Sequence, residues 1–364
     1  MKIKTLLLWS VTLAALAFAS CSGDDTAGSD PTGPGTAGDQ LQTVRLYLNV
    51  PSTATARVGD PGYPTGEGED WDQLAVMIES ANGEAITADG SHYYVKTLSI
   101  EEYKDLPEQS GYRWLPIDLV EGSSVYIYGV TYSQGVTGDP SSDIQGIENA
   151  GSGSFANLEI PNNYSADESG QIDAAKFLSV ATGYYEKNGN REFTVTQPTG
   201  DLYDPATMPT MTLTRLAAKI DIQWDAADAY PNYTDVKVTN FTFYNNKDAE
   251  SQVTHSNGAL FPDLHNVEGA DGHTTFYNTS EISQRNGRVY HYAFPNGSTP
   301  EVRFTITSES PGAGSSEHDY TFEFKNKLQK ATWYKLNVTI RGNSGNATIS
   351  QEDESGILNV GGNG

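Results

Sequence analysis

Cysteine is almost absent from this chain, because Cys21 is the single cysteine in 364 residues. One thiol cannot form an intramolecular disulfide, and a thiolate metal site needs several cysteines, so packing alone must stabilise the fold. The sequence also lacks a His-Glu-x-x-His zinc motif, a Gly-x-Ser-x-Gly nucleophile elbow and a glycine-rich phosphate loop. The six histidines show no ligand spacing. We therefore expect no enzyme activity, no metal site and no cofactor.

Basic residues are scarce as well. Lys and Arg total 22 against 47 Asp and Glu, which makes the formal net charge −25. Such a chain repels nucleic-acid phosphates, so we expect no nucleic-acid partner. The acidic segments 66–72 and 351–355 lack the spaced oxygen ligands of a calcium loop, and we interpret both as solvated loops. A hydrolase remains an alternative without named residues, because two carboxylates can become partners through folding alone.

The one long apolar run lies at the start of the chain. A basic beginning, MKIK, precedes Leu6 to Phe18, and this run falls short of the roughly 20 residues needed to span a bilayer. Small side chains at 19 and 20 then precede Cys21. This order predicts a lipoprotein signal peptide over residues 1–20, with Cys21 as the acylated residue. Phe18 stands where leucine is usual, so ordinary signal-peptide cleavage stays open as an alternative.

The segment after the cysteine is small and polar. Ser-Gly-Asp-Asp at 22–25 resembles the acidic export tag of surface lipoproteins in Bacteroidetes, which implies a position outside the outer membrane. Residues 22–40 contain no large apolar side chain and cannot bury enough surface to fold. We therefore predict a disordered tether over residues 21–40.

The remaining chain reads as an all-β protein. Tyr, Phe, Thr and Val recur in short alternating runs, separated by turns rich in Gly, Pro, Asn and Asp. The clearest run is QTVRLYLNV, in which one face carries Val44, Leu46, Leu48 and Val50 and the other carries Thr43, Arg45, Tyr47 and Asn49. We predict further strands within 71–80, 91–100, 125–132, 177–180, 216–224, 236–244, 302–306, 320–324 and 334–340.

Three local features complete the prediction. A change of phase in VKVTNFTFY indicates a β-bulge near Asn240. Segment 146–155 reads as a loop. The proline-rich segment 196–210 has almost no periodicity, so we place a boundary there between domains 41–206 and 207–364.

Four blocks carry a family resemblance. They are the lipoprotein start, the strand QTVRLYLNV with the following ARVGD, the strand DQLAVMIES, and the pair LTRLAAKIDIQW and NKLQKATWYKLNVTI. In this order they resemble the fimbrillin family, the major and accessory fimbrial subunits (type V pilins) of Bacteroidales. The resemblance implies two tandem transthyretin-like β-sandwich domains in a lipid-anchored surface protein of the outer membrane.

The resemblance also implies an assembly mechanism. An arginine-specific or trypsin-like protease cuts the loop after the first strand, and a strand of another fimbrial subunit fills the vacated groove in a homo- or heteropolymer. In this chain the removable strand would be Val44, Leu46, Leu48 and Val50, and the cut would follow Arg57, which lies in a polar loop. The alternative for Arg57 is a solvated loop residue.

The tail suggests which subunit this is. After Ile340 the apolar residues are broken by an acidic run and glycines, so the tail is a weak donor strand. This favours a tip or accessory subunit that accepts a strand and contacts a host or bacterial surface ligand, although an anchor that keeps its lipid stays open. An alternative from another class is a monomeric surface lipoprotein that binds glycans through exposed aromatic residues such as Trp71 and Trp114.

Overall fold

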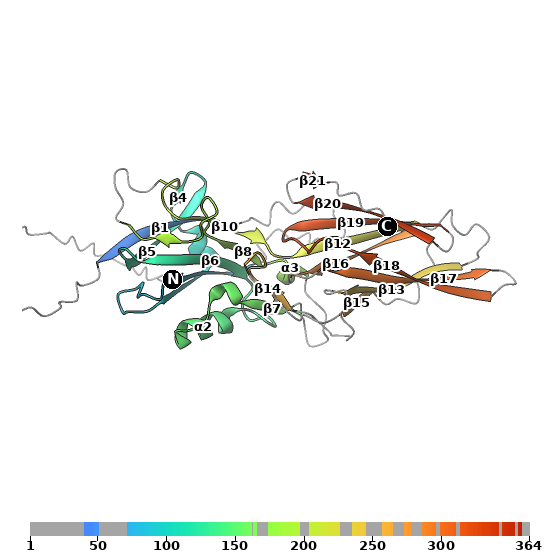
Figure 1. The fold of residues 1–364 in the computed structure, drawn as a ribbon, viewed down its shortest axis with the longest axis horizontal. Coiled ribbons are helices and arrows are strands. Elements are labelled where there is room, and N and C mark those ends of the chain that lie inside the picture. The colour runs from blue at the N-terminus through green and yellow to red at the C-terminus, as the bar shows by residue number, and fades with distance from the viewer. Residues whose placement is uncertain are drawn as a thin grey trace, which may run out of the picture. The chain divides into compact units, whose positions relative to one another are not determined.

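The computed structural model describes residues 40–50, 71–161, 163–165, 174–196, 204–225, 235–244, 257–264, 273–277, 286–295, 299–310, 314–341, 344–353 and 356–358. They belong to one compact unit that spans Asp39–Gly364. Most of them lie in β-strands, which confirms the all-β prediction (Figure 1). The predicted signal peptide, almost all of the predicted tether and the loop that contains Arg57 fall outside the described residues.

Strands between residues 41 and 215 form two facing sheets. Sheet 1 has the order β10-β1-β5-β4, and sheet 2 has the order β11-β8-β6-β2-β3 with β9 paired to β6. The strands of sheet 1 are β1 (Leu41–Asn49), β4 (Glu108–Gln109), β5 (Tyr112–Val120) and β10 (Thr210–Thr212). Those of sheet 2 are β2 (Gln73–Ser80), β3 (Tyr93–Ser99), β6 (Ser124–Tyr132), β8 (Ala181–Tyr184), β9 (Phe193–Thr194) and β11 (Thr214–Arg215).

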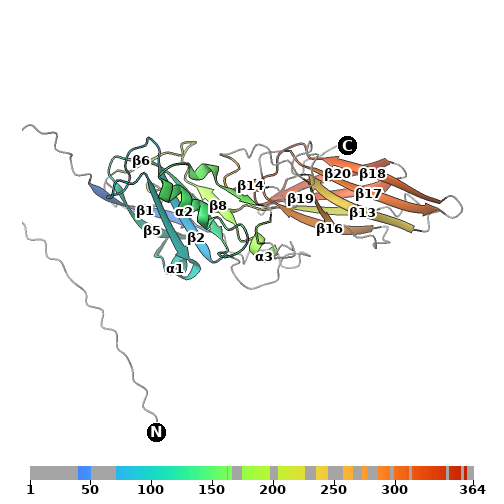
Figure 2. The same ribbon diagram turned by 90° about the horizontal axis from the view of Figure 1, so that it is seen from below.

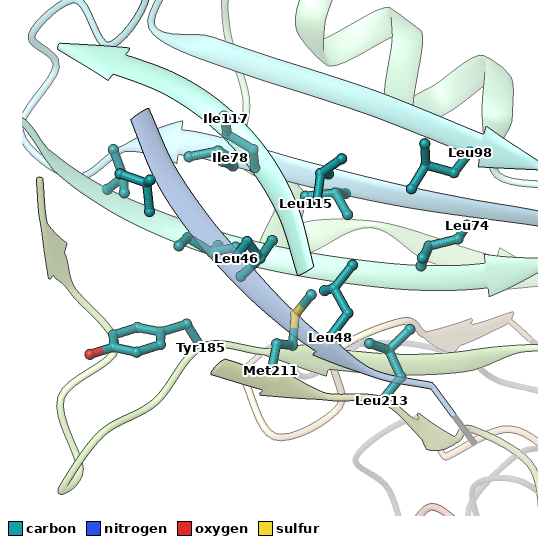
Figure 3. Packing of buried hydrophobic residues seen from close by; sticks show 14 of the residues in the cluster. Leu46, Leu48, Leu74, Ile78, Leu98, Leu115, Ile117, Tyr185, Met211 and Leu213 are labelled. Atoms are coloured by element: carbon teal, nitrogen blue, oxygen red, sulfur yellow. The ribbon is translucent and has the colours of Figure 1, made fainter. Parts of the chain in front are cut away.

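Apolar side chains from both sheets fill the space between them. Because side chains alternate along a strand, every second residue of a strand can point into this core. β1, β2 and β5 each contribute a set of two-residue spacing, and Figure 3 shows part of the cluster. These residues are Val44, Leu46, Leu48, Leu74, Val76, Ile78, Leu115, Ile117 and Leu119.

The second face of sheet 2 is covered by short elements. They are α2 (Ser141–Ala150), the 3₁₀ turn Phe155–Asn157, α3 (Ala174–Phe177) and the small pair β7 (Glu159–Pro161) with β14 (Asn257–Ala259). A second cluster of buried side chains lies under them, including Tyr128, Phe155, Phe177 and Phe261. A further short helix, α1 (Ile100–Lys104), begins at a Ser99 capping box.

Later residues form a second pair of sheets (Figure 2). Sheet 3 contains β16 (Asn286–Ala293), β12 (Ala218–Asp225), β19 (Thr332–Arg341), β20 (Ser344–Asp353) and β21 (Gly356–Leu358), in that order. Sheet 4 contains β15 (His273–Tyr277), β13 (Asp235–Tyr244), β17 (Glu301–Ser310) and β18 (Gly314–Glu323). Their shared core includes Ile220, Trp224, Phe241, Phe304 and Leu336.

Several local predictions can be compared with these elements. The register of β13 shifts between Thr239 and Thr242, which confirms the bulge near Asn240. The prediction of a strand at 177–180 is wrong, because α3 ends at Phe177 and β8 begins only at Ala181. Segment 146–155 is not all loop, since α2 continues to Ala150. Residues 177–180 are all buried, and so short a buried segment does not distinguish a strand from a helix by its periodicity.

The predicted long strand at 216–224 corresponds to β12, and the short strand before it, β11, belongs to a different sheet. β11 ends at Arg215 in sheet 2, whereas β12 begins at Ala218 in sheet 3. Leu216 accordingly joins the cluster on the outer face of sheet 2, and Ile220 joins the core of sheets 3 and 4. Sheet membership therefore changes between 215 and 218, a few residues beyond the predicted boundary at 206/207. The division into two domains stays a prediction.

Candidate functional site

The first strand, β1, lies inside sheet 1 with a neighbour on each side. It pairs antiparallel with β5 from Leu41↔Val120 to Leu48↔Arg113, and parallel with β10 from Tyr47↔Thr210 to Asn49↔Thr212. β1 thus fills a seam between two strands that come from distant parts of the sequence. Removing it would leave the facing backbone groups of β5 and β10 without these partners.

The inward face of β1 is the predicted apolar set. Val44 is 3% exposed, and Leu46 and Leu48 are fully buried. Val50, which follows the strand, is half-buried and packs on the edge of the same cluster. Figure 3 shows Leu46 and Leu48 among Leu115, Ile117, Met211 and Leu213. Each fully buried side chain of this size contributes about 1.5 to 3 kcal/mol.

The outward face of β1 also makes side-chain contacts. Thr43 Oγ1 donates a hydrogen bond to Asp118 Oδ1 at 2.5 Å. The Arg45 guanidinium lies over the Trp114 ring, 4.0 Å from its centroid. The Tyr47 hydroxyl donates to Gln109 Oε1 at 2.9 Å, and the Tyr47 ring meets that of Tyr112 edge to face. Side chains on both faces of β1 therefore make specific contacts with neighbouring residues.

Tyr47 is the residue of this site that the sequence reasoning missed. It belongs to the set predicted to face away from the core, yet its side chain is fully buried. β4 folds back on β5 through Gln109↔Tyr112 and brings both residues against the Tyr47 ring. The signal that could have indicated this cover is the turn sequence EQSGY at 108–112, where Ser110 and Gly111 have positive φ.

β10 pairs with β1 on the side opposite β5. This strand was not predicted from the sequence. Leu213 N donates to Asn49 O at 2.9 Å, and Tyr47 N donates to Pro209 O at 2.9 Å. The chain then crosses to sheet 2, where β11 pairs with β8. The crossing runs over the paired glycines Gly129 and Gly183.

Close approach of another backbone explains why position 183 is glycine. A Cβ built on Gly183 would lie 2.4 Å from the carbonyl oxygen of Thr212, and one on Gly129 would lie 2.5 Å from Met211 Cε. At Gly183 the neighbouring atoms are backbone, so only a residue without a Cβ fits there, whereas at Gly129 the nearest atom is the end of the Met211 side chain. Gly183 therefore sets how closely the segment carrying β10 can pack on sheet 2.

The Asp118 carboxylate beside the seam influences a neighbouring phenol. Asp118 is exposed, and its negative charge adds to burial, the larger cause, in raising the pKa of the Tyr94 phenol above its usual value. Among the residues that the structure describes, no group of three or more His, Cys, Asp or Glu side chains is placed to hold a metal ion. Within the same ranges, no helix has the length and hydropathy of a membrane span.

The remaining site predictions are placed as follows. Cys21 and Arg57 lie outside the described residues, so acylation and cleavage stay predictions. Trp71, suggested for glycan binding, is only 4% exposed and packs edge to face on Tyr103 with ring centroids 5.6 Å apart. Trp114 is half-buried beneath Arg45. Neither ring is a free platform for a sugar.

Sequence comparisons return no relatives of this chain. No family model matches it. No curated protein matches it either.

Solved structures with a similar fold include fimbrial proteins. A fimbrial assembly protein from Parabacteroides distasonis is 13% identical, with 88% of this chain and 99% of that chain covered and a TM-score of 0.44. The tip fimbrial protein Mfa3 from Porphyromonas gingivalis is 11% identical over 86% of this chain and 100% of that chain, with a TM-score of 0.46. The fimbrial anchor protein Mfa2 from the same organism is 9% identical over 87% and 99%, with a TM-score of 0.39. At this identity the likeness concerns the fold alone.

Proposed function

We propose that the chain is a lipid-anchored fimbrial subunit of the cell surface, a tip or accessory subunit, that contributes to adhesion. In this proposal β1 is a removable strand, which a protease separates from the body by cutting after Arg57. A strand of another subunit then takes its place. The observation that carries the proposal is that β1 is paired with β5 on one side and β10 on the other, with Val44, Leu46 and Leu48 buried.

The energetics favour replacement over simple loss. Burial of three such side chains is worth about 4.5 to 9 kcal/mol. This is comparable with the whole stability of a domain, about 5 to 15 kcal/mol. A body that lost β1 would expose this apolar surface together with unpaired backbone groups, and main-chain hydrogen bonds to a new strand would restore both. An empty groove therefore recruits a donor.

The C-terminal strands support an accepting rather than a donating role. β20 pairs with β19 along its whole length, from Ser344↔Arg341 to Asp353↔Thr332, and β21 pairs with β20. Donating β20 to a neighbour would break this pairing within its own sheet. An accepting subunit at the tip or in an accessory position needs no such loss.

Limited trypsin digestion tests the cleavage step. We expect rapid cleavage after Arg57, while the bond after Arg45 resists because a paired strand cannot enter a protease cleft. The remainder should keep its circular dichroism spectrum and a cooperative thermal transition. The Arg57→Gln variant is the matched control and should lose the early cut. Degradation of the whole chain at the same rate would count against the proposal.

Acylation of Cys21 is tested separately. In cells fed a radiolabelled fatty acid, we expect the label to enter the wild-type chain and not the Cys21→Ala variant, because no other cysteine is available. Mass spectrometry of the mature N-terminus checks the site. Equal labelling of both chains would exclude Cys21 as the acylated residue.

A further inference from the structure

The outward side chains of β1 meet β5 at closely spaced positions. Trp114 N donates to Pro107 O at 3.0 Å and Tyr47 N to Pro209 O at 2.9 Å, so neither amide bonds the other strand. Tyr47↔Trp114 is therefore a non-hydrogen-bonded pair of the antiparallel ladder. In such pairs the side chains approach most closely. Since the pattern repeats every two residues, Arg45↔Pro116 and Thr43↔Asp118 belong to the same class.

Pro116 fits this geometry and limits the other edge of β5. Proline has no amide hydrogen, so it suits a position whose nitrogen points away from β1. β4 covers β5 only at Tyr112 and Arg113, and Pro116 is exposed beyond that cover. An added strand is discouraged on that edge. The side of β5 that β1 occupies is the side open to a full-length partner.

Three recognition positions follow along this side. The Asp118 carboxylate accepts a hydrogen bond from a hydroxyl, the Trp114 ring holds a cation, and Gln109 accepts from a tyrosine whose ring packs on Tyr112. We define the outward triplet as the hydroxyl, cation and tyrosine that β1 supplies at 43, 45 and 47. Apolar side chains at 44, 46 and 48 are common to many strands, whereas this triplet is not.

The last strands of the described chain do not carry the triplet. β20 reads SGNATISQED and β21 reads GIL, and neither contains a lysine, an arginine or an aromatic residue. A second copy that offered these strands would leave the Trp114 face without a cation and Gln109 without its donor. Because they lack the triplet, we do not expect β20 or β21 of one copy to be the donor strand for another copy.

We propose that the groove selects its donor through the outward triplet, and that the donor is a strand of a different fimbrial subunit with a hydroxyl, a cation and a tyrosine at alternate positions. This inference rests on the proposed strand exchange and names its partner. The inward apolar residues supply most of the affinity, while the outward contacts set the register and choose among strands of equal hydrophobicity.

A peptide-exchange experiment tests this selection. Full-length protein nicked by trypsin after Arg57 is incubated with fluorescent peptides, and uptake is followed by anisotropy. The matched peptide contains residues 41–50. The triplet-free peptide carries Thr43→Val, Arg45→Thr and Tyr47→Val, which keep strand propensity and the inward face. The tail peptide contains residues 344–358. We expect the matched peptide to bind at least about tenfold more tightly than either of the others.

The outcomes separate the inference from the proposed function. Equal uptake of the matched and triplet-free peptides would overturn selection by the triplet and leave strand exchange intact. Uptake of the tail peptide as tight as that of the matched peptide would overturn the choice of a different subunit. Failure of every peptide to enter a nicked, folded protein would refute strand exchange itself, and the inference with it.

A charge swap distinguishes recognition from a general loss of packing. In the Asp118→Lys protein, nicked in the same way, we expect the preference to reverse toward a matched peptide that carries Thr43→Glu. Asp118 is exposed, so this variant should fold normally. If the wild-type and Asp118→Lys proteins show the same order of affinity for the two peptides, residue 118 does not select the side chain at position 43.

Discussion

The Leu46→Asp variant is expected to lose its cooperative fold. Leu46 is fully buried in the middle of β1, opposite Leu115 and within the core of sheets 1 and 2. The substitution removes about 1.5 to 3 kcal/mol of burial and adds the cost of several kcal/mol for an unpaired buried carboxylate. This total reaches the range of a domain's entire stability. Thermal unfolding followed by circular dichroism should show a greatly lowered midpoint or no transition.

Leu41→Asp is the matched control. Leu41 begins the same strand and pairs with Val120, but 47% of its surface is exposed. The same chemical change should therefore shift the free energy of unfolding by about 0.5 kcal/mol or less. If the two variants were equally stable, β1 would not be part of the folded core, and its removal could not open an apolar groove.

The inward face of this strand could be predicted from the sequence because it depends on local periodicity. Val44, Leu46 and Leu48 alternate with polar residues, and a half-buried strand is the simplest structure with that period. The bulge in β13 could be predicted for the same reason, because the change of phase in the apolar alternation lies within the strand's own sequence. Features that repeat within one strand leave a signal in its own residues.

Features that depend on distant segments left no such signal. The burial of Tyr47 requires Gln109 and Tyr112, which arrive through the β4–β5 turn. The β10 wall of the groove is only three residues long, too short to show a period, and it lies next to a proline-rich segment that reads as a boundary. Of the two strands that pair with β1, β10 was therefore the less predictable from the sequence.

The short helices show a different limit. α2, predicted partly as a loop, contains Gly146, which lowers its helical propensity, and its one buried residue is Ile144. Its stability comes from packing over sheet 2 and not from its own sequence. Tertiary contacts of this kind decide the structure of segments whose local preferences are nearly balanced.

Gly183→Ala is expected to destabilise the protein by about 3 kcal/mol, because overpacking against a fixed backbone forces strands apart. The new Cβ would meet the Thr212 carbonyl oxygen at 2.4 Å and Leu213 Cα at 3.2 Å. These atoms belong to the segment that carries β10 to sheet 2, so they cannot rotate away as a flexible side chain would. Urea denaturation should show a lower midpoint with an unchanged slope.

Gly146→Ala provides the control, because a Cβ at this position in α2 meets nothing within 4 Å. Alanine favours a helix over glycine by about 1 kcal/mol, so this variant should be as stable as wild type or slightly more so. The two variants also differ in what they predict for the groove. Displacing β10 weakens one wall of the seam, so nicked Gly183→Ala protein should release β1 faster than nicked Gly146→Ala protein. Equal release rates would mean that β5 alone retains the strand, and that the contact with β10 at 47–49 contributes nothing to holding it.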